Sequence, residues 1–402
     1  MSDCTSPSAR LDPTPSTRLL RCGPARTPFG ETAEALFMTS GFVYETAEEA
    51  SARFAGEADG YMYSRYDNPT VDMFEQRMAL LEGAEKGAAT ASGMAAMTAS
   101  LLCHLTQGDH VVAGRALFGS CRVVIEQILP RFGITHTLVD GTDLDAWRGA
   151  VRPETKAFFL ETPSNPTLEI IDLAAVADIA HGAGGRLIVD NVFATPVLQR
   201  PMDLGADVVF YSATKHVDGQ GRCLGGIVLS SEDFYRDHLQ SFLRNTGPSM
   251  SPFNAWVLAK GLETLSLRVD RQSEHAARVA EGLTGRAGIT RVLYPGRTDH
   301  PQHALASRQM RAGGTLLAFE VAGGTPAAFR MMNRLQIIDI SNNLGDTKSL
   351  ITHPATTTHR KLSQQDRDVL GISDGVLRLS VGLEDPQDLI DDLTQALSGA
   401  RS

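Results

Sequence analysis

Positive charge is in the minority in this 402-residue chain, where 37 Lys and Arg face 47 Asp and Glu and the formal net charge is −10 at pH 7. A chain with this balance has no general positive field for a phosphate backbone, so no nucleic acid partner is expected. Long hydrophobic runs are also missing. The longest stretch without charge, residues 87–108, is rich in Gly, Ser, Thr and Ala and contains His104. No membrane span is predicted.

Sequence signals for secretion and for metal binding are missing as well. The first eighteen residues are rich in Ser, Thr and Pro and hold no apolar run of the kind found in secretory signals. The five cysteines include no Cys-x-x-Cys pair, and the eleven histidines include no His-x-x-x-His pair with an intervening Glu. Neither a zinc clamp nor a zinc hydrolase is therefore favoured. We expect a cytoplasmic protein with no metal site.

From about Val71 onward, the chain alternates helical patterns with short apolar runs. Four runs have the length of buried strands, at residues 111–113, 157–160, 187–189 and 208–211. Such alternation predicts an α/β fold with a mostly parallel sheet covered by helices. Residues 255–283 carry apolar side chains at helical spacing and predict one long helix that leaves the sheet domain.

This pattern divides the chain into three parts. Residues 1–60 are expected to form an N-terminal tail and arm, residues 61–260 a large sheet domain, and residues 261–402 a smaller α+β domain. The length agrees with two or three domains, at roughly 150 residues for each.

Polar residues follow the predicted strands, at the sheet edge where ligands bind in open parallel sheets. Lys215 comes shortly after one strand, and an unpaired ammonium is costly to bury. Burial would lower its pKa and make an amine able to form a Schiff base with a carbonyl cofactor such as pyridoxal phosphate. Asp190 ends another strand, where a carboxylate could keep a pyridine nitrogen protonated. The alternatives are a surface lysine beside a helix end and an Asp that caps a helix or turn.

A cradle for a phosphate is predicted at residues 90–97, where small residues run into a helix. The free N–H groups and the dipole of a helix N-terminus favour an anion. The hydroxyl groups of Ser212 and Thr214 could bind the same phosphate. A tight helix entry with small residues for close packing would show the same pattern.

With these features in order, the chain resembles the Cys/Met-metabolism family of pyridoxal phosphate (PLP) enzymes, which have the aspartate aminotransferase-like fold, or fold type I. The resemblance extends over nearly the whole chain after about residue 20. It is carried by six ordered motifs at residues 63–70, 91–96, 161–167, 189–191, 212–216 and 377–384. Within the family, segments 118–121, 216–222 and 339–346 most resemble O-succinylhomoserine sulfhydrylases.

The resemblance implies a role for each candidate residue. Lys215 would be the catalytic Schiff-base lysine, and Arg378, Asn165 and Ser341 would bind substrate, with the planar guanidinium of Arg378 suited to a carboxylate. Contacts to PLP are implied for Tyr63, Arg65, Ser92, Gly93, Met94, Phe118, Asn165, Asp190, Ser212, Thr214 and Lys215.

The resemblance also implies a homo-oligomer, expected to be a tetramer built from dimers with shared active sites. Tyr63 and Arg65 would reach the phosphate bound by a neighbouring subunit. The partners expected otherwise are small molecules, namely an O-acylhomoserine and sulfide.

Phe118 departs from the pattern of many relatives, which have Tyr at the position that stacks on the cofactor ring. Phe keeps the stacking and loses the phenol, which is thought to help relatives that expel a thiol with proton transfer. The resemblance therefore implies replacement of an acyloxy group on O-succinylhomoserine or O-acetylhomoserine by sulfide, giving homocysteine for methionine biosynthesis. Cystathionine γ-synthase, methionine γ-lyase and a catalytically silent PLP-fold partner protein are the alternatives. Arg115 and Arg122 are candidates to bind a distal succinyl carboxylate.

Overall fold

A computed structural model describes residues 14–23 and 26–398. Its larger sheet has the strand order β1-β7-β6-β5-β4-β2-β3. All neighbouring strands in this sheet are parallel except those that pair with β7, which is antiparallel to β1 and β6. The strands are β1 (Lys86–Thr90), β2 (His110–Gly114), β3 (Thr135–Val139), β4 (Thr155–Glu161), β5 (Arg186–Asp190), β6 (Val208–Ser212) and β7 (Gly226–Ser230).

The four predicted apolar runs form β2, β4, β5 and β6, and each is buried on both faces. In β4, Phe158 and Leu160 pack into the core on one side of the sheet, and Phe159 packs into the core on the other. Helices cover both faces, so each strand reads as continuous apolar sequence and not as an alternation. The strands β1, β3 and β7 were not predicted, and of these β3 is a half-exposed edge strand that pairs only with β2.

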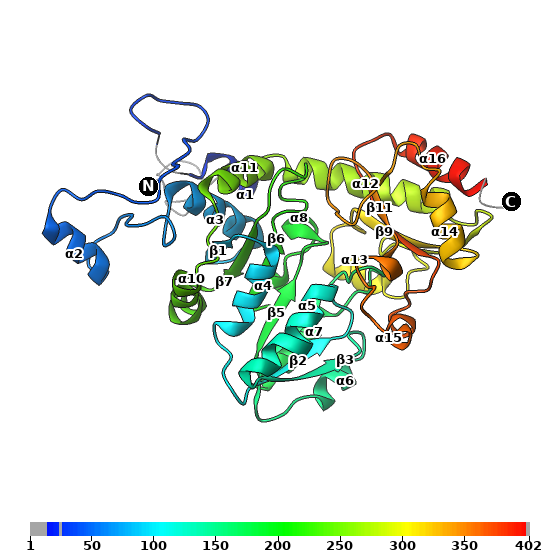
Figure 1. Cartoon of the computed structure of the whole chain (residues 1–402), viewed down its shortest axis with the longest axis horizontal. Coiled ribbons are helices and arrows are strands. Elements are labelled where there is room, and N and C mark those ends of the chain that lie inside the picture. The colour runs from blue at the N-terminus through cyan, green and yellow to red at the C-terminus, as the bar shows by residue number, and fades with distance from the viewer. Residues whose placement is uncertain (1–13, 24–25, 399–402) are drawn as a thin grey trace.

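Helices of the first 262 residues cover this sheet and form the N-terminal arm (Figure 1). The helix α3 shows how the sequence sets their ends: Asn68 accepts a hydrogen bond from the Thr70 N–H, Pro69 begins the helix, and Gly83 ends it at a φ of 83°. They are α1 (Pro15–Arg21), α2 (Ala47–Ala55), α3 (Pro69–Glu82), α4 (Gly93–Leu102), α5 (Gly119–Val123), α6 (Leu144–Gly149), α7 (Leu173–Gly182), α8 (Thr195–Leu198), α9 (Glu232–Phe234), α10 (Gln240–Thr246) and α11 (Pro252–Leu262).

A second sheet of five strands, in the order β10-β11-β12-β9-β8, forms the core of the C-terminal part. Its strands are β8 (Ile289–Leu293), β9 (Leu316–Val321), β10 (Asp339–Ile340), β11 (Leu350–Thr352) and β12 (Val376–Ser380). Its helices are α12 (Leu265–Leu283), α13 (His303–Gln309), α14 (Gly324–Met332), α15 (Gln364–Val369) and α16 (Pro386–Ser398).

The prediction of a single helix over residues 255–283 is wrong. The structure has two helices, α11 and α12, which meet at Glu263 and Thr264. At the break, a residue near the start of α12 binds both the end of α11 and the turn after β6. The guanidinium of Arg268 donates to the carbonyl of Gly261 at 2.9 Å and to the carbonyl of His216 at 2.7 Å. The start of α12 therefore holds the turn that carries Lys215.

Both large cores contain part of α12. Its first turns pack with the core of the seven-stranded sheet through Leu265 and Val269, and its later turns pack with the second core through Val279 and Leu283. The domain boundary predicted at residue 261 lies just before this helix and stays a prediction. Helix α13 packs back onto the larger core through Ala306 and Met310.

None of the helices in the described part of the chain is long and apolar enough to cross a membrane.

Candidate active site

The carboxyl ends of three neighbouring strands place polar side chains at one edge of the larger sheet. Glu161 ends β4 and lies beside Asp190, the last residue of β5. The next strand, β6, ends at Ser212 and leads into the turn that contains Lys215. The structure thus brings Asp190 and Lys215 to the same edge, where the strand pattern predicted them.

Lys215 is largely buried and has one side-chain partner. Its Nζ donates a hydrogen bond to Oδ1 of Asn343 at 2.6 Å. Burial, with a smaller contribution from the nearby positive charge of Arg378, lowers the pKa of Lys215 to about 8. About a tenth of this amine is therefore unprotonated at pH 7, far more than for an ordinary lysine, and is able to attack a carbonyl carbon.

Asp190 is a buried carboxylate with little to compensate its charge. Its Oδ1 accepts a hydrogen bond from the Val192 N–H at 3.1 Å, and no cation among the described residues lies within salt-bridge distance. Burial raises the pKa of Asp190 to about 7. A protonated ring nitrogen is the kind of partner that would restore the ionised form.

The predicted phosphate cradle forms where the N-terminus of α4 meets the end of β6. Ser92 caps α4 by accepting a hydrogen bond from the Ala95 N–H at 3.2 Å. A Cβ atom added to Gly93 would lie 2.5 Å from Cβ of Ser212, so only glycine lets the helix start approach this strand so closely. The backbone N–H groups of Gly93 and Met94 belong to the first turn of α4, whose amides lack helical partners.

Thr214 lies in the turn just after Ser212 and is fixed to the neighbouring strand connection. Its hydroxyl donates to the carbonyl of Gly225 at 3.3 Å and accepts from the Gly225 N–H at 3.1 Å. The Ser212 side chain lies against the start of α4, whereas the contact of the Thr214 hydroxyl with a phosphate stays a prediction.

Glu161 ties together two of the predicted cofactor contacts, and sequence reasoning gave it no role. Its two carboxylate oxygens accept from the Phe118 N–H at 2.6 Å and from the Asn165 N–H at 2.9 Å. Burial, followed by the charge of Asp190, raises the pKa of Glu161 well above its usual value. The signal that could have identified it is its place at the end of a buried apolar strand, the same signal that identified Asp190.

Arg378 is buried in β12 and has no carboxylate partner among the described residues. Its guanidinium donates to Oδ1 of Asn165 at 3.0 Å and to the carbonyls of Asn342 and Asn343 at 3.0 and 3.2 Å, while its Nε has no partner. Burial lowers the pKa of Arg378 to about 10. A buried cation with only neutral partners is suited to the carboxylate of an amino acid.

Asn343, and not the predicted Ser341, contacts both Lys215 and Arg378. The Ser341 hydroxyl instead accepts a hydrogen bond from the Asn343 N–H at 3.2 Å and lines the adjacent cleft. Asn343 lies in a segment that carries the family resemblance, but nothing in its sequence context distinguishes it from Asn342. The substrate role of Ser341 stays a prediction.

Tyr63 and Arg65 do not join the cradle within this chain. The Arg65 guanidinium lies 5.2 Å from the ring centroid of Tyr63 and 4.8 Å from that of Tyr66, and it donates to the carbonyl of Arg244 in α10. Their predicted contact with a phosphate therefore depends on a second subunit.

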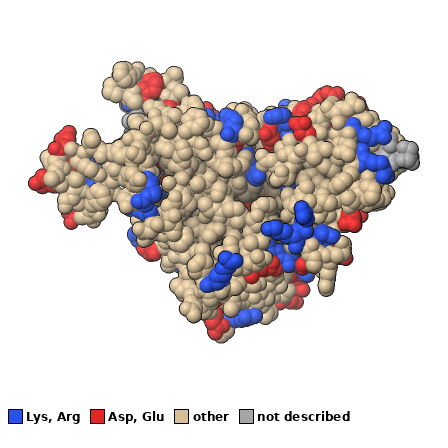
Figure 2. Space-filling model, viewed as in Figure 1, with Lys and Arg blue, Asp and Glu red and all other residues tan. Residues whose placement is uncertain are grey.

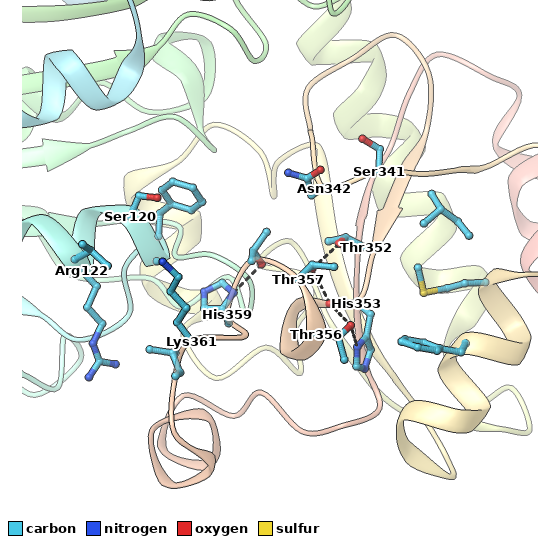
Figure 3. A pocket seen from close by; sticks show the side chains of 18 of the residues that line it. Ser120, Arg122, Ser341, Asn342, Thr352, His353, Thr356, Thr357, His359 and Lys361 are labelled. Atoms are coloured by element: carbon cyan, nitrogen blue, oxygen red, sulfur yellow. Dashed lines mark hydrogen bonds between the residues drawn. The ribbon is translucent and has the colours of Figure 1, made fainter.

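A cleft of about 750 Å³ opens beside these residues (Figure 3). Phe118, Asn342 and His359 form its inner wall. His359 is buried next to Asn165 and Arg378, and burial lowers its pKa to about 4, so its imidazole is neutral at physiological pH. Residues 14–23 and 26–398 contain no group of three His, Cys, Asp or Glu side chains that could hold a metal ion.

The residues at this edge fit PLP. Lys215 is an amine of lowered pKa for its aldehyde, Asp190 is a carboxylate for its ring nitrogen, and the Gly93–Ser212 approach is a cradle for its phosphate. The amine, the carboxylate and the cradle therefore match the aldehyde, the ring nitrogen and the phosphate of one PLP molecule.

Comparison with known proteins agrees with this geometry. A family model described as Cys/Met metabolism PLP-dependent enzyme matches residues 16–398. An O-succinylhomoserine sulfhydrylase of Mycobacterium tuberculosis is 53% identical over 385 residues, 94% of each chain, and an L-methionine gamma-lyase of Porphyromonas gingivalis is 41% identical over 384 residues, 95% of this chain and 96% of the other. A solved Campylobacter jejuni structure with an N′-pyridoxyl-lysine-5′-monophosphate aligns with a TM-score of 0.91 and 33% identity over 96% of this chain and 99% of the other.

Proposed function

Because this chain belongs to the Cys/Met-metabolism family of PLP-dependent enzymes, we propose that it replaces the succinyloxy group of O-succinylhomoserine with sulfide to give homocysteine and succinate. The observation that carries this proposal is the buried Arg378, which has only neutral partners and lies next to the Lys215–Asn343 pair. An amino acid whose carboxylate binds Arg378 would present its α-carbon to the Lys215 amine. The 53% identity to a sulfhydrylase supports the choice of reaction within the family.

PLP, when bound, acts as the electron sink that makes the α-proton and then a β-proton of the substrate acidic. In this proposal, the Asp190 carboxylate holds the proton on the ring nitrogen. Ser92, Ser212 and Thr214 bind the phosphate together with the backbone N–H groups of Gly93 and Met94. Phe118 packs on the ring, and Glu161 holds the backbone of Phe118 in place.

Lys215 carries the protons in this scheme. With a pKa of about 8 it changes protonation state easily near neutral pH, so one amine can remove the α-proton and later return protons to the product. Asn343 accepts a hydrogen bond from this amine and can hold it in position between transfers. Arg378 and Asn165 orient the α-carboxylate.

Phe118 favours replacement of an acyloxy group over cleavage of a carbon–sulfur bond. A carboxylate is a weak base and leaves with little protonation, whereas a thiolate leaves more readily when an acid is close by. Phe118 has no ionisable group to supply that proton. This reasoning makes cystathionine γ-synthase the nearest alternative, because it expels the same group and differs only in using cysteine.

The oligomeric state and the cellular location of the protein belong to the same proposal. We propose a cytoplasmic homotetramer built from dimers, in which Tyr63 and Arg65 of one subunit bind the phosphate held by another. The N-terminal arm projects from the body with α2 at its outer end (Figure 1). It exposes 95% of Phe29, 93% of Val43 and 67% of Phe54, a set of apolar side chains that a second copy would cover.

A product assay tests the reaction. With O-succinylhomoserine, sulfide should give homocysteine with a kcat/KM at least about tenfold higher than the value with cysteine, a difference of about 1.4 kcal/mol in transition-state binding. Preferred formation of cystathionine would instead identify a cystathionine γ-synthase. Rapid release of methanethiol from methionine would identify a lyase and refute the argument from Phe118. A protein that binds PLP and converts none of these substrates would be the silent partner.

A further inference from the structure

The cleft beside the active site has an outer end with its own charged residues. Its inner wall, with Phe118, Asn342 and His359, borders the residues that hold the α-carboxylate and the reacting carbons. The cleft is also lined by Arg122 of α5, by Glu126 just after α5, and by Lys361 in the segment that leads into α15. A group attached to the γ-oxygen of a substrate held by Arg378 would extend into this cleft.

Arg122 is one of the two candidate cations for a distal succinyl carboxylate, and it already forms two ion pairs. Its Nε donates to Glu126 at 2.9 Å, and its terminal nitrogen donates to Asp366 of α15 at 3.1 Å. Arg115, the other, does not line the cleft and pairs with Asp140. The charge of each guanidinium is therefore already balanced by at least one carboxylate.

Lys361 differs from both. It lines the cleft, and no carboxylate of the described residues lies within 4.0 Å of its ammonium. Figure 3 shows its side chain extending from the end of the threonine-rich segment toward the wall that carries Ser120. Figure 2 shows a group of Lys and Arg side chains, with acidic side chains beside it, near the position at which Figure 1 shows α15.

The neutral polar groups of this wall are mostly occupied. The hydroxyls of Thr356, Thr357 and Thr358 bond to His353, to Thr352 and to His359 at 2.7–3.0 Å. They stiffen the segment just before Lys361 and leave few free donors for a ligand. The ammonium of Lys361, with three donors and no acceptor, is the strongest unpaired anion-binding group of the cleft.

We propose that Lys361 binds the distal carboxylate of the acyl donor and makes this enzyme prefer O-succinylhomoserine over O-acetylhomoserine, an inference that rests on the proposed function. The succinyl group ends in a carboxylate and the acetyl group ends in a methyl. The Lys361 ammonium therefore stabilises only the first, through an ion pair in the cleft next to Ser120. Arg122 keeps α15 against α5 and does not discriminate between donors.

The test compares the two donors in the cofactor-loaded enzyme at saturating sulfide. Lys361→Met should lower kcat/KM for O-succinylhomoserine about tenfold, mainly through KM, because one charge-assisted hydrogen bond is lost. Its kcat/KM for O-acetylhomoserine should stay within about twofold of the wild type. Lys361→Arg should recover most of the loss. Arg360→Met removes the neighbouring exposed cation, which does not line the cleft, and should change neither donor.

Succinate inhibition gives a second measurement that does not depend on turnover of the acyl donor. Succinate should compete with O-succinylhomoserine about tenfold less well in Lys361→Met than in the wild type. Equal losses with both donors, or no loss with either, would overturn the inference. A selective loss in Arg122→Met with none in Lys361→Met would overturn it in favour of Arg122. If the wild type converts neither donor, the proposed function fails, whereas a failure confined to Lys361 leaves it standing.

Discussion

Replacing Arg378 by methionine should lower kcat/KM at least about 30-fold and change the stability of the fold little. Burial lowers the pKa of this guanidinium from 12.5 to about 10. At about 1.4 kcal/mol per pKa unit, the charge costs the folded state about 3 kcal/mol. Because the folded pKa is the lower one, this cost is fully present at pH 7 and disappears only as the pH rises through 10 and above.

The hydrogen bonds of Arg378 offset this cost. It donates to Asn165, Asn342 and Asn343, and each such bond contributes about 0.5 to 1.5 kcal/mol. The two effects nearly cancel, so Arg378→Met should change the free energy of unfolding by no more than about 2 kcal/mol. Removing one side of a buried bidentate pair with a substrate carboxylate costs about 2 to 5 kcal/mol, which lowers kcat/KM at least about 30-fold.

The measurement pairs steady-state kinetics with urea unfolding of the cofactor-loaded protein. Arg77→Met is the control, because Arg77 is equally buried but pairs with Glu34 and Glu263. It should lose more stability than Arg378→Met, because Glu34 and Glu263 then share Lys260 as their cation, and it should keep kcat/KM near the wild-type value. If Arg378→Met unfolds as easily as Arg77→Met, or keeps its kcat/KM within threefold of wild type, the reasoning about an unpaired buried cation is refuted.

Two further predictions concern the cofactor. The purified protein should be yellow, and borohydride should bleach it and fix the mass of PLP on the peptide that contains Lys215; recovery of the label on another lysine would refute this role. In the cofactor-free protein, acylation of Lys215 should rise through pH 8, because burial lowers its pKa to about 8 and only the unprotonated amine reacts; a rise only near pH 10 would contradict the structure. For the shared site, Arg65→Ala should weaken PLP retention, and mixing inactive Lys215→Ala and Arg65→Ala subunits should restore activity in hybrids with one intact site. Hybrids that form and stay inactive would count against it.

The sequence predicted the parts of this fold that depend on local pattern. The four apolar runs form β2, β4, β5 and β6 because helices cover both faces of the sheet, and Asp190 and Lys215 follow from their places after two of these strands. The small residues at 90–97 predicted a phosphate cradle, and the close approach of Gly93 to Ser212 is compatible with it. PLP dependence and the fold type follow from the resemblance and are confirmed by the family match.

What the sequence missed depends on contacts between distant segments. Asn343 is 128 residues from Lys215, and Glu161 is 43 residues from Phe118. No periodicity specifies such pairs. The break between α11 and α12 was missed because apolar spacing continues through Glu263 and Thr264, and only the turn held by Arg268 explains it. The predicted role of Tyr63 and Arg65 in a neighbouring subunit stays a prediction.

Helix α13 limits how this protein could exchange parts with its relatives. The Gln309 side chain donates to the carbonyl of Ile171 and accepts from the Leu173 N–H, and the Arg311 N–H donates to the carbonyl of Leu198. Residues beyond 300 thus complete the hydrogen bonding at the start of α7 and the end of α8, two helices formed before residue 200. A chimaera joined near residue 261 would inherit one half of these bonds from each parent. Productive crossovers between family members should therefore keep the α13 segment together with its own large domain.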